Sequence, residues 1–438
     1  MHERIQIEVA ASALEAFVVI ATGERVDFDA ALADMRSGLA EAGVIFGVHE
    51  RALTNAAARL SEDLEDVERH PVAFAEPPIP GTPAALTPAL ELGIKPGVPR
   101  DDGTVDYRDR SLLKPVEADT LLATYRPPVP AQDGTGVDGS AIPPPAQDTG
   151  RLQLGSGAES TGDGLVYSTI AGVVKWDGAL SIDVVAHVTH NGDVDFASGH
   201  LRMEGDITIN GTVQEGFGVR ATGDVEIRGD VDGGTVIAGG DVQIGGVIIG
   251  ESALVSAAGH VTARRVQNAV VRSRSRVELQ IDAIEAHTSG AEVVVNGIVR
   301  GGRTEAETAV VVKEAGGAAI GAHLAVGKPT EWPEDLAQSL ARLAASRRYG
   351  SKSLDRRSRA GSHRRADGAS RAEEAVRDAQ LRERQRTAIQ MARVDVSGTA
   401  AAGVTIEVGD RRKTLLDPIR GARFRLDPRR DIIIFEEL

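Results

Sequence analysis

Short segments in which apolar and polar residues alternate recur through the middle of the chain. Examples are the triplets Val225-Glu226-Ile227 and Val242-Gln243-Ile244, each of which follows a Gly-Asp pair. Such alternation is typical of a strand with one buried face, so the aliphatic residues are predicted to point inward. Aligned on the glycine, the copies are GDVDFASGHL (192–201), GDITINGTV (205–213), GDVEIRGDV (223–231), GDVQIGGVI (240–248) and GHVTARRVQ (259–267). Two further copies lack the glycine, SRVELQIDAI (275–284) and AEVVVNGIV (291–299).

The spacing of these copies predicts a β-solenoid. After a shorter first interval, the copies that carry the glycine begin about 17 to 19 residues apart, which is the scale of one solenoid coil. Equivalent side chains of neighbouring coils should stack, and the predicted internal ladder is Ile207, Val225, Val242 and Val261. Glycines are expected at the corners, where positive φ or a close backbone approach is needed. The predicted structural turn residues are Gly205, Asp206, Gly223, Asp224, Gly240 and Asp241.

Proline and aromatic residues are distributed as a solenoid requires. None of the 19 prolines lies between residues 146 and 328, and proline is kept out of sheet interiors because it lacks an N–H group. Aromatic residues make up only 3% of the chain, which suits a narrow interior filled by small aliphatic side chains. We therefore predict a solenoid domain over residues 166–328.

The N-terminal part, residues 1–165, is predicted to be an α+β domain with a proline-rich connector. Residues 27–43 and the stretch with Leu53, Ala57, Leu60 and Leu64 show helical spacing of apolar residues. Asp29 is the predicted N-cap of the first helix and Gly43 its C-terminal stop. Short strands such as 105–107 follow, and the segment 127–145 is expected to be an irregular connector.

The C-terminal part is predicted to contain a helical pair and a short β tail. Leu336, Leu340 and Leu343 form one apolar stripe, and residues 371–394 form a second, charged helix. Residues 346–368 between them are basic and rich in Ser and Gly, which predicts a mobile loop. The predicted domains are therefore 329–395 for the helical segment and 396–438 for the tail, with strands at 404–408 and 432–435.

Charge and cysteine content restrict the possible functions. The net charge of -15 disfavours nucleic acid as a partner, because phosphate backbones are bound by basic surfaces. The absence of cysteine excludes disulfides, thiolate metal sites and thiol catalysis, and agrees with a reducing compartment. The first residues lack a secretion signal and no apolar run is long enough to span a membrane, so we expect a soluble protein.

Candidate chemical motifs are better explained as structure. Residues 134–139 fit G-x-G-x-x-G but lie between prolines rather than between a strand and a helix, which predicts a turn. Gly327-Lys328 resembles the end of a P-loop, but Pro329 replaces the hydroxyl that binds magnesium. His187 and His190 should point to opposite faces of a strand, and His260 replaces a repeat aspartate at a corner.

The repeated aspartates could instead bind calcium or act in polysaccharide cleavage. The structural interpretation is favoured for Asp193, Asp206, Asp224 and Asp241, because each follows a turn glycine and its side chain can bond the local backbone. No tandem calcium-binding repeat and no clustered catalytic set is visible. We therefore predict no enzymatic activity, no catalytic or metal-binding residues and no cofactor.

The sequence resembles the flagellar assembly protein A (FapA) family over essentially its whole length. The resemblance rests on GLAEAGVIFGVHE (38–50), ADTLLATYRPPVP and GTGVDGSAIPPP before the repeats, the Gly-Asp block through AVGKP (325–329), and GVTIEVGD (403–410). It implies a cytoplasmic, non-enzymatic protein with a right-handed parallel β-solenoid that acts in flagellar assembly or its regulation. It also implies a coiled-coil hairpin after the solenoid, a region that Gly350, Gly361 and Gly368 interrupt here.

We expect a scaffold or regulatory protein that binds protein partners. The predicted contact region combines the stripe of Leu336, Leu340 and Leu343 with a basic arm. This arm includes Arg347, Arg348, Arg356 and Arg357, and residues 342–386 hold an excess of about eight basic residues. The alternatives for the basic arm are contact with a membrane surface and a merely solvated loop. The sequence does not determine the oligomeric state. Two other functions are a polysaccharide-acting or metal-dependent β-helix enzyme, and a filament like bactofilins or MinC, which capped solenoid ends disfavour.

Overall fold

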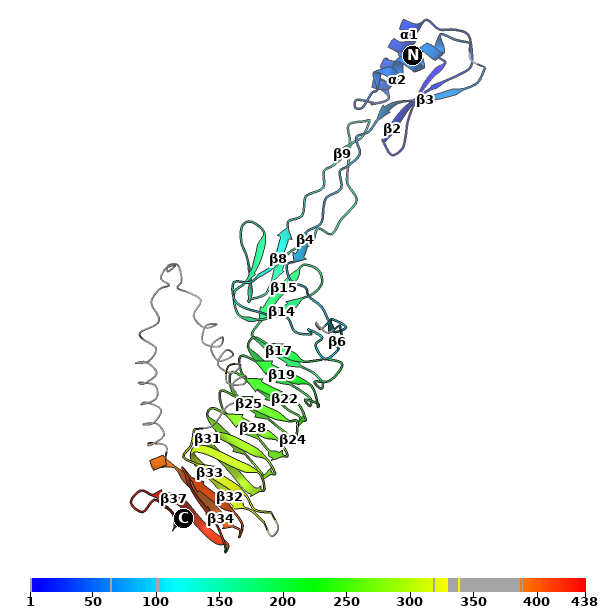
Figure 1. Ribbon diagram of the computed structural model, residues 1–438. Helices are drawn as coiled ribbons and strands as arrows, with labels where there is room; N and C mark the ends of the chain where they lie inside the picture. Colours follow the sequence, from blue (N-terminus) through cyan, green and yellow to red (C-terminus); the bar gives the residue numbers. More distant parts are fainter. Residues whose placement is uncertain are drawn as a thin grey trace. The chain divides into compact units, whose positions relative to one another are not determined.

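Figure 1 presents the computed structural model, which describes residues 2–63, 65–99, 103–317, 320–329 and 389–438, together with residues 338 and 387. The chain forms two compact units, one of residues 1–87 and 125–153 and the other of residues 88–124 and 154–438. This division differs from the predicted one, because residues 88–124 and 154–165 group with the solenoid. The predicted stripe of leucines, the four arginines of the basic arm and Leu64 lie outside the described residues.

The first unit contains a small α+β core. Strands β1 (Ile5–Val9), β2 (Glu15–Ile20) and β3 (Glu68–Phe74) form an antiparallel sheet. Helices α1 (Phe28–Glu41) and α2 (Glu50–Leu60) pack Met35, Leu39 and Leu53 with the buried side of this sheet. The N-cap of α1 is Asp27 and not Asp29, because the Asp27 carboxylate accepts a 3.1 Å hydrogen bond from the Ala30 amide. Gly43 follows the C-cap with φ of +77°, as the helix stop requires.

The proline-rich connector of the same unit is extended and partly paired. Residues 127–145 were expected to be irregular, but they contain β9 (Gly134–Thr135) and β10 (Ala141–Ile142), which pair with each other. Isolated bridges also join Ile79 to Gln132 and Thr82 to Val129. The G-x-G-x-x-G segment forms a turn after β9, closed by a 2.9 Å bond from the Gly139 amide to the Gly136 carbonyl.

The second unit is dominated by a 23-stranded sheet that winds into a parallel β-solenoid (Figure 1). Each coil passes through three faces, which we call faces A, B and C. Face A begins with β16 (His187–His190), β18 (Asp206–Ile209), β20 (Val225–Ile227), β23 (Val242–Ile244), β26 (Val261–Ala263) and β29 (Arg276–Leu279). Face B contains β21 (Val231–Asp232), β24 (Val247–Ile249), β27 (Arg265–Gln267) and β30 (Ala283–Ile284). Face C contains β17 (Leu201–Met203), β19 (Gly218–Ala221), β22 (Thr235–Ala238), β25 (Leu254–Ala257) and β28 (Val270–Ser273).

The last coils use longer strands. Strands β31 (His287–Arg300) and β32 (Arg303–Ala315) each run across faces C, A and B in turn. Strands β33 (His323–Val326) and β35 (Thr405–Val408) continue face C, and β34 (Arg393–Ala400) continues face A. Residues on both sides of the segment 330–388 therefore belong to one continuous solenoid.

The predicted internal ladder is confirmed. Ile207 pairs with Val225, Val225 with Val242, and Val242 with Val261, and all four are at most 1% exposed. The neighbouring Glu226 and Gln243 point away from the interior and are half-buried and exposed, respectively. The interior is filled mainly by Val, Ile, Leu and Ala, as the low aromatic content predicted.

The first sequence copy was aligned incorrectly. Strand β16, and not the segment after Gly192, precedes β18 on face A, so Val188 pairs with Ile207. Gly192-Asp193 lies at another corner, where Val194 bridges to Val213 and Val213 to Val231. This assignment explains the short first interval, and the parallel ladder begins at His187 rather than at residue 166.

Antiparallel strands close the C-terminal end of the solenoid. Strand β37 (Ile419–Asp427) pairs antiparallel with β34, β38 (Ile432–Glu437) with β37, and β36 (Arg411–Thr414) with β35. The predicted tail strands are thus present, but they extend the solenoid sheet instead of forming a separate domain. A parallel coil that continued from another molecule would have to displace this antiparallel cap.

Smaller sheets precede the solenoid in the chain. One has the order β11 (Gln153–Leu154), β15 (Ser181–Val185), β14 (Gly172–Trp176) and β7 (Pro115–Val116), and Val173 of β14 joins the solenoid core. Another has the order β12 (Ala158–Ser160), β13 (Leu165–Ser168), β8 (Leu121–Arg126) and β4 (Ala85–Pro88). Strands β5 (Val98–Pro99) and β6 (Val105–Asp106) form a pair. Among the described residues, no helix is long and apolar enough to cross a membrane.

Candidate functional site

The repeated aspartates connect consecutive coils. The Oδ1 atom of Asp206 accepts a 2.7 Å hydrogen bond from the amide of Asp224, one coil further on. Asp224 accepts in the same way from the Asp241 amide at 2.8 Å, and Asp241 from the His260 amide at 2.8 Å. The expectation that these carboxylates bond their own local turn was wrong, because each instead satisfies a backbone N–H of the next coil.

Two glycines at this corner make room for the carboxylate of the preceding coil. A Cβ atom on Gly223 would lie 2.0 Å from Oδ1 of Asp206, and one on Gly259 would lie 2.0 Å from Oδ1 of Asp241. Gly205, in the first coil of this corner, has φ of +123°. In the pair Gly223-Asp224 the glycine therefore admits the Asp206 carboxylate, while Asp224 supplies the acceptor for the next coil. Gly259 admits the Asp241 carboxylate in the same way, although His260 follows it.

A second corner uses the same chemistry. Asp193 accepts a 2.8 Å hydrogen bond from the Thr212 amide, and Asp230 accepts a 2.7 Å bond from the Val247 amide. The Thr212 hydroxyl accepts from the Asp230 amide at 3.3 Å between them. These carboxylates are spread along corners instead of converging, and the described part of the chain has no group of three or more His, Asp or Glu residues that could hold a metal ion.

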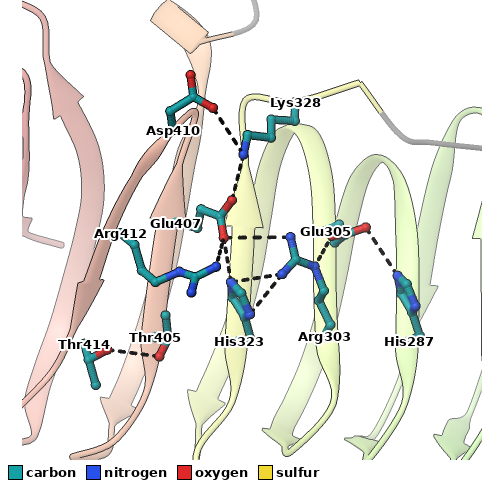
Figure 2. A network of polar contacts seen from close by, with 10 residues as sticks. All are labelled: His287, Arg303, Glu305, His323, Lys328, Thr405, Glu407, Asp410, Arg412 and Thr414. Atoms are coloured by element: carbon teal, nitrogen blue, oxygen red, sulfur yellow. Dashed lines mark hydrogen bonds and ion pairs between the residues drawn. The ribbon is translucent and has the colours of Figure 1, made fainter.

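The most connected polar site lies on the outside of face C in the last coils (Figure 2). We call it the terminal charge network and define it by eight residues. They are His287 on β31, Arg303 and Glu305 on β32, His323 on β33, Lys328 after β33, Glu407 on β35, Asp410 after β35 and Arg412 on β36.

Glu407 is the centre of this network and is only 5% exposed. Its Oε1 accepts from Lys328 Nζ at 2.9 Å, and its Oε2 from His323 Nε2 at 2.9 Å and from Arg412 at 3.2 Å. Burial raises the pKa of Glu407, but the hydrogen bonds from Lys328, His323 and Arg412 outweigh it and lower the pKa to about 2. Glu407 is thus ionised at neutral pH and cannot act as a general acid.

The other members of the network are paired as well. Hydrogen bonding to His287 lowers the pKa of Glu305 to about 2, against an opposing effect of burial, and Arg303 also contacts this carboxylate. Burial lowers the pKa of His323, although its bond to Glu407 opposes that shift. A groove of about 230 Å3 lies beside Arg303, Glu305 and Lys328. Because its charged groups already bond one another, the network joins successive coils rather than presenting a reactive group.

The network also fixes the place where the chain leaves the solenoid. Lys328 contacts both Glu407 and the exposed Asp410, at 2.9 and 3.3 Å. The returning chain comes back beside it, since a Cβ atom on Gly327 would lie 3.3 Å from Cβ of Ala392 and 3.4 Å from Cγ1 of Ile389. The Gly-Lys pair that resembles a P-loop therefore holds an ion pair at an exit point. Sequence reasoning missed the network because its members are up to 125 residues apart, from residue 287 to residue 412.

These observations define a class: a capped, parallel β-solenoid protein whose regularly spaced carboxylates bond its own backbone. A family model described as the Flagellar Assembly Protein A beta solenoid domain matches residues 186–432, and one described as the Flagellar Assembly Protein A N-terminal region matches residues 5–179. The chain belongs to the FapA family. No curated protein and no solved structure matches it significantly.

Proposed function

We propose that this protein is a non-enzymatic scaffold or regulatory protein of the cytoplasm that acts in flagellar assembly, or its regulation, through protein–protein contacts. Membership of the FapA family supports the flagellar process. The observation that carries the scaffold role is the use of the repeated carboxylates as coil-to-coil hydrogen-bond acceptors. Acids that are engaged in this way support a structural role better than acid/base catalysis.

The shape of the solenoid supports recognition through its lateral faces. The interior is closely filled and the C-terminal end is closed by antiparallel strands. Repeat proteins of this kind bind partners along their sides or through appended segments. We propose that the segment inserted at Lys328 is one such contact region, with Leu336, Leu340 and Leu343 anchoring a partner and a basic arm steering an acidic one toward it.

The arm is tested by changing four of its arginines to serine in the full chain: Arg347, Arg348, Arg356 and Arg357. Co-purification with flagellar assembly components from the source organism should weaken, chiefly through a lower association rate at low salt. The melting curve should not change. Flagella counted per cell provide the functional readout, and a deletion strain with normal flagella would refute the flagellar role. Unchanged partner binding at low ionic strength would show that the arm is only a solvated loop.

A further inference from the structure

We propose that a groove on the outside of face C, far along the chain from the terminal charge network, binds an acidic peptide segment of a protein partner. The inference rests on the proposed scaffold function and adds the chemistry of the partner. The groove has a volume of about 270 Å3. Its principal lining residues are His200, Arg202, Phe217, Arg220, Thr235 and Ile237, and we call it the arginine groove.

Two arginines lie on adjacent rungs of the groove. Arg202 on β17 and Arg220 on β19 are register partners, so their backbones are about 4.8 Å apart, the spacing of neighbouring strands. Like charges at directly paired positions destabilise a sheet. An anion bound between the two guanidinium groups would remove that repulsion, and guanidinium groups bind carboxylates through paired N–H donors.

A third guanidinium lies at the rim. The Cζ atom of Arg108 is 5.8 Å from the centre of the Phe217 ring, and a Cβ atom on Gly216 would lie 3.0 Å from it. Two carboxylates lie close to these arginines: Asp109 is 3.4 Å from Arg202, and Asp106 accepts a 2.9 Å hydrogen bond from the Arg108 amide. Three guanidinium groups against these two carboxylates leave a local positive excess on a protein whose net charge is -15. This local excess is the charge complement of an acidic ligand.

The apolar residues of the groove favour a peptide over a free anion. Phe217 and Ile237 are only 3% and 6% exposed and form the floor of the groove. Phe196 is 63% exposed and packs edge-on against Phe217, with ring centres 4.8 Å apart, so it presents an apolar surface beside the groove. A groove with cations at one side and apolar walls suits acidic side chains that flank an apolar one.

Nucleic acid fits this site less well. Stacking of successive bases needs several exposed aromatic faces, whereas Phe217 is buried and Phe196 is the exposed ring that packs against it. Tight binding of a phosphate backbone also needs many cations along a track, whereas three arginines lie at this groove and one of them is already paired with Asp109. The geometry therefore favours a short carboxylate-rich peptide.

The test uses the full chain and a fluorescent peptide with three glutamates on each side of a central leucine. A counterpart with glutamine in place of glutamate is the charge control. We expect the acidic peptide to bind, with an affinity that falls as salt rises, and the glutamine peptide to bind at least tenfold more weakly. Arg202→Ser and Arg220→Ser should each weaken binding by about tenfold, the loss expected for one charge-assisted hydrogen bond.

Arg264→Ser is the matched control, because Arg264 is an exposed arginine outside the groove. It should leave peptide binding and melting unchanged, and the groove variants should melt at or above the wild-type temperature because each removes one of two like charges. Equal binding of the two peptides, or equal loss in the Arg264 variant, would overturn the inference. So would an oligothymidine or inorganic phosphate that displaces the peptide at lower concentration than unlabelled peptide does. If only the inference of peptide binding is wrong, binding through the basic arm and the flagellar phenotype will still be observed. This outcome distinguishes failure of the inference from failure of the proposed function.

Discussion

Replacing Gly223 with alanine is expected to destabilise the solenoid strongly although it adds only one methyl group. The new Cβ would lie 2.0 Å from Oδ1 of Asp206 and 2.8 Å from the carbonyl carbon and oxygen of Gly205. The Asp206 carboxylate would have to leave its 2.7 Å bond with the Asp224 amide, a loss of about 1.5–3 kcal/mol for a hydrogen bond to a charged group. Displacing the packed backbone adds about 1–3 kcal/mol. The expected total is about 2.5–6 kcal/mol.

The assay combines thermal and denaturant unfolding, followed by circular dichroism, with hydrogen exchange at the Asp224 amide. Exchange supplies a local reading, because solenoid coils depend mainly on their neighbours and one coil can open separately. Gly162→Ala is the control, since a Cβ atom there meets no other atom within 4 Å. We expect it to remain within about 1 kcal/mol of wild type.

A double-mutant cycle with Asp206→Ala isolates the cause. If the clash with the carboxylate dominates, Gly223→Ala should cost at least about 1.5 kcal/mol less in the Asp206→Ala background than in wild type. An equal cost in both backgrounds, or faster exchange elsewhere but not at the Asp224 amide, would refute the paired role of glycine and aspartate.

Three other substitutions test the register, the terminal charge network and the repeated aspartates. Ile227→Asp places an unpaired charge at a position that is 0% exposed and should unfold the solenoid. Glu226→Gln on the outer side should change the melting temperature little. Similar tolerance of both substitutions would contradict the register. Because the folded pKa of Glu407 is about 2, below its usual 4.5, its stabilisation of up to about 3 kcal/mol is complete above pH 4.5 and is lost as the pH falls through 2. Glu407→Gln should therefore reduce the dependence of the melting temperature on pH in that range. Asp410→Asn, at a side chain that is 94% exposed, should leave this dependence unchanged. The same pH dependence in both variants would argue against the network. Replacing Asp206, Asp224 and Asp241 together with asparagine should preserve the fold and flagellation, because the amide oxygen still accepts the backbone hydrogen bond. Loss of function with a normal melting curve would revive a metal-binding or enzymatic role.

Much of the solenoid could be read from the sequence because its side chains obey a simple period. Alternation along Val225, Glu226 and Ile227 fixes which residues face inward, since a shift of one residue would bury the charged side chain. The length of one coil follows from the spacing of the Gly-Asp pairs, and the small aliphatic side chains indicate a narrow interior. These properties depend on local pattern and burial, which a single sequence contains.

The tertiary structure decided which atoms meet. The pair Gly192-Asp193 has the same local chemistry as Gly205-Asp206, yet it lies at another corner, because the alignment of coils depends on stacking along whole faces. The acceptor role of each aspartate also depends on a partner 17 to 19 residues away, which local turn preference does not contain.

The same reason explains the two surface sites. Glu407 meets His323 and Lys328 across a segment of about 80 residues, and Arg202 meets Arg220 only because β17 and β19 are register partners. Neither set has a regular spacing in the sequence that a motif could capture, because the winding of the chain, and not the order of its residues, brings the charges together. The sequence by itself determined the repeated strand and its inward face, whereas the closure of the sheet and the positions of its charged groups came from the packing of one coil on the next.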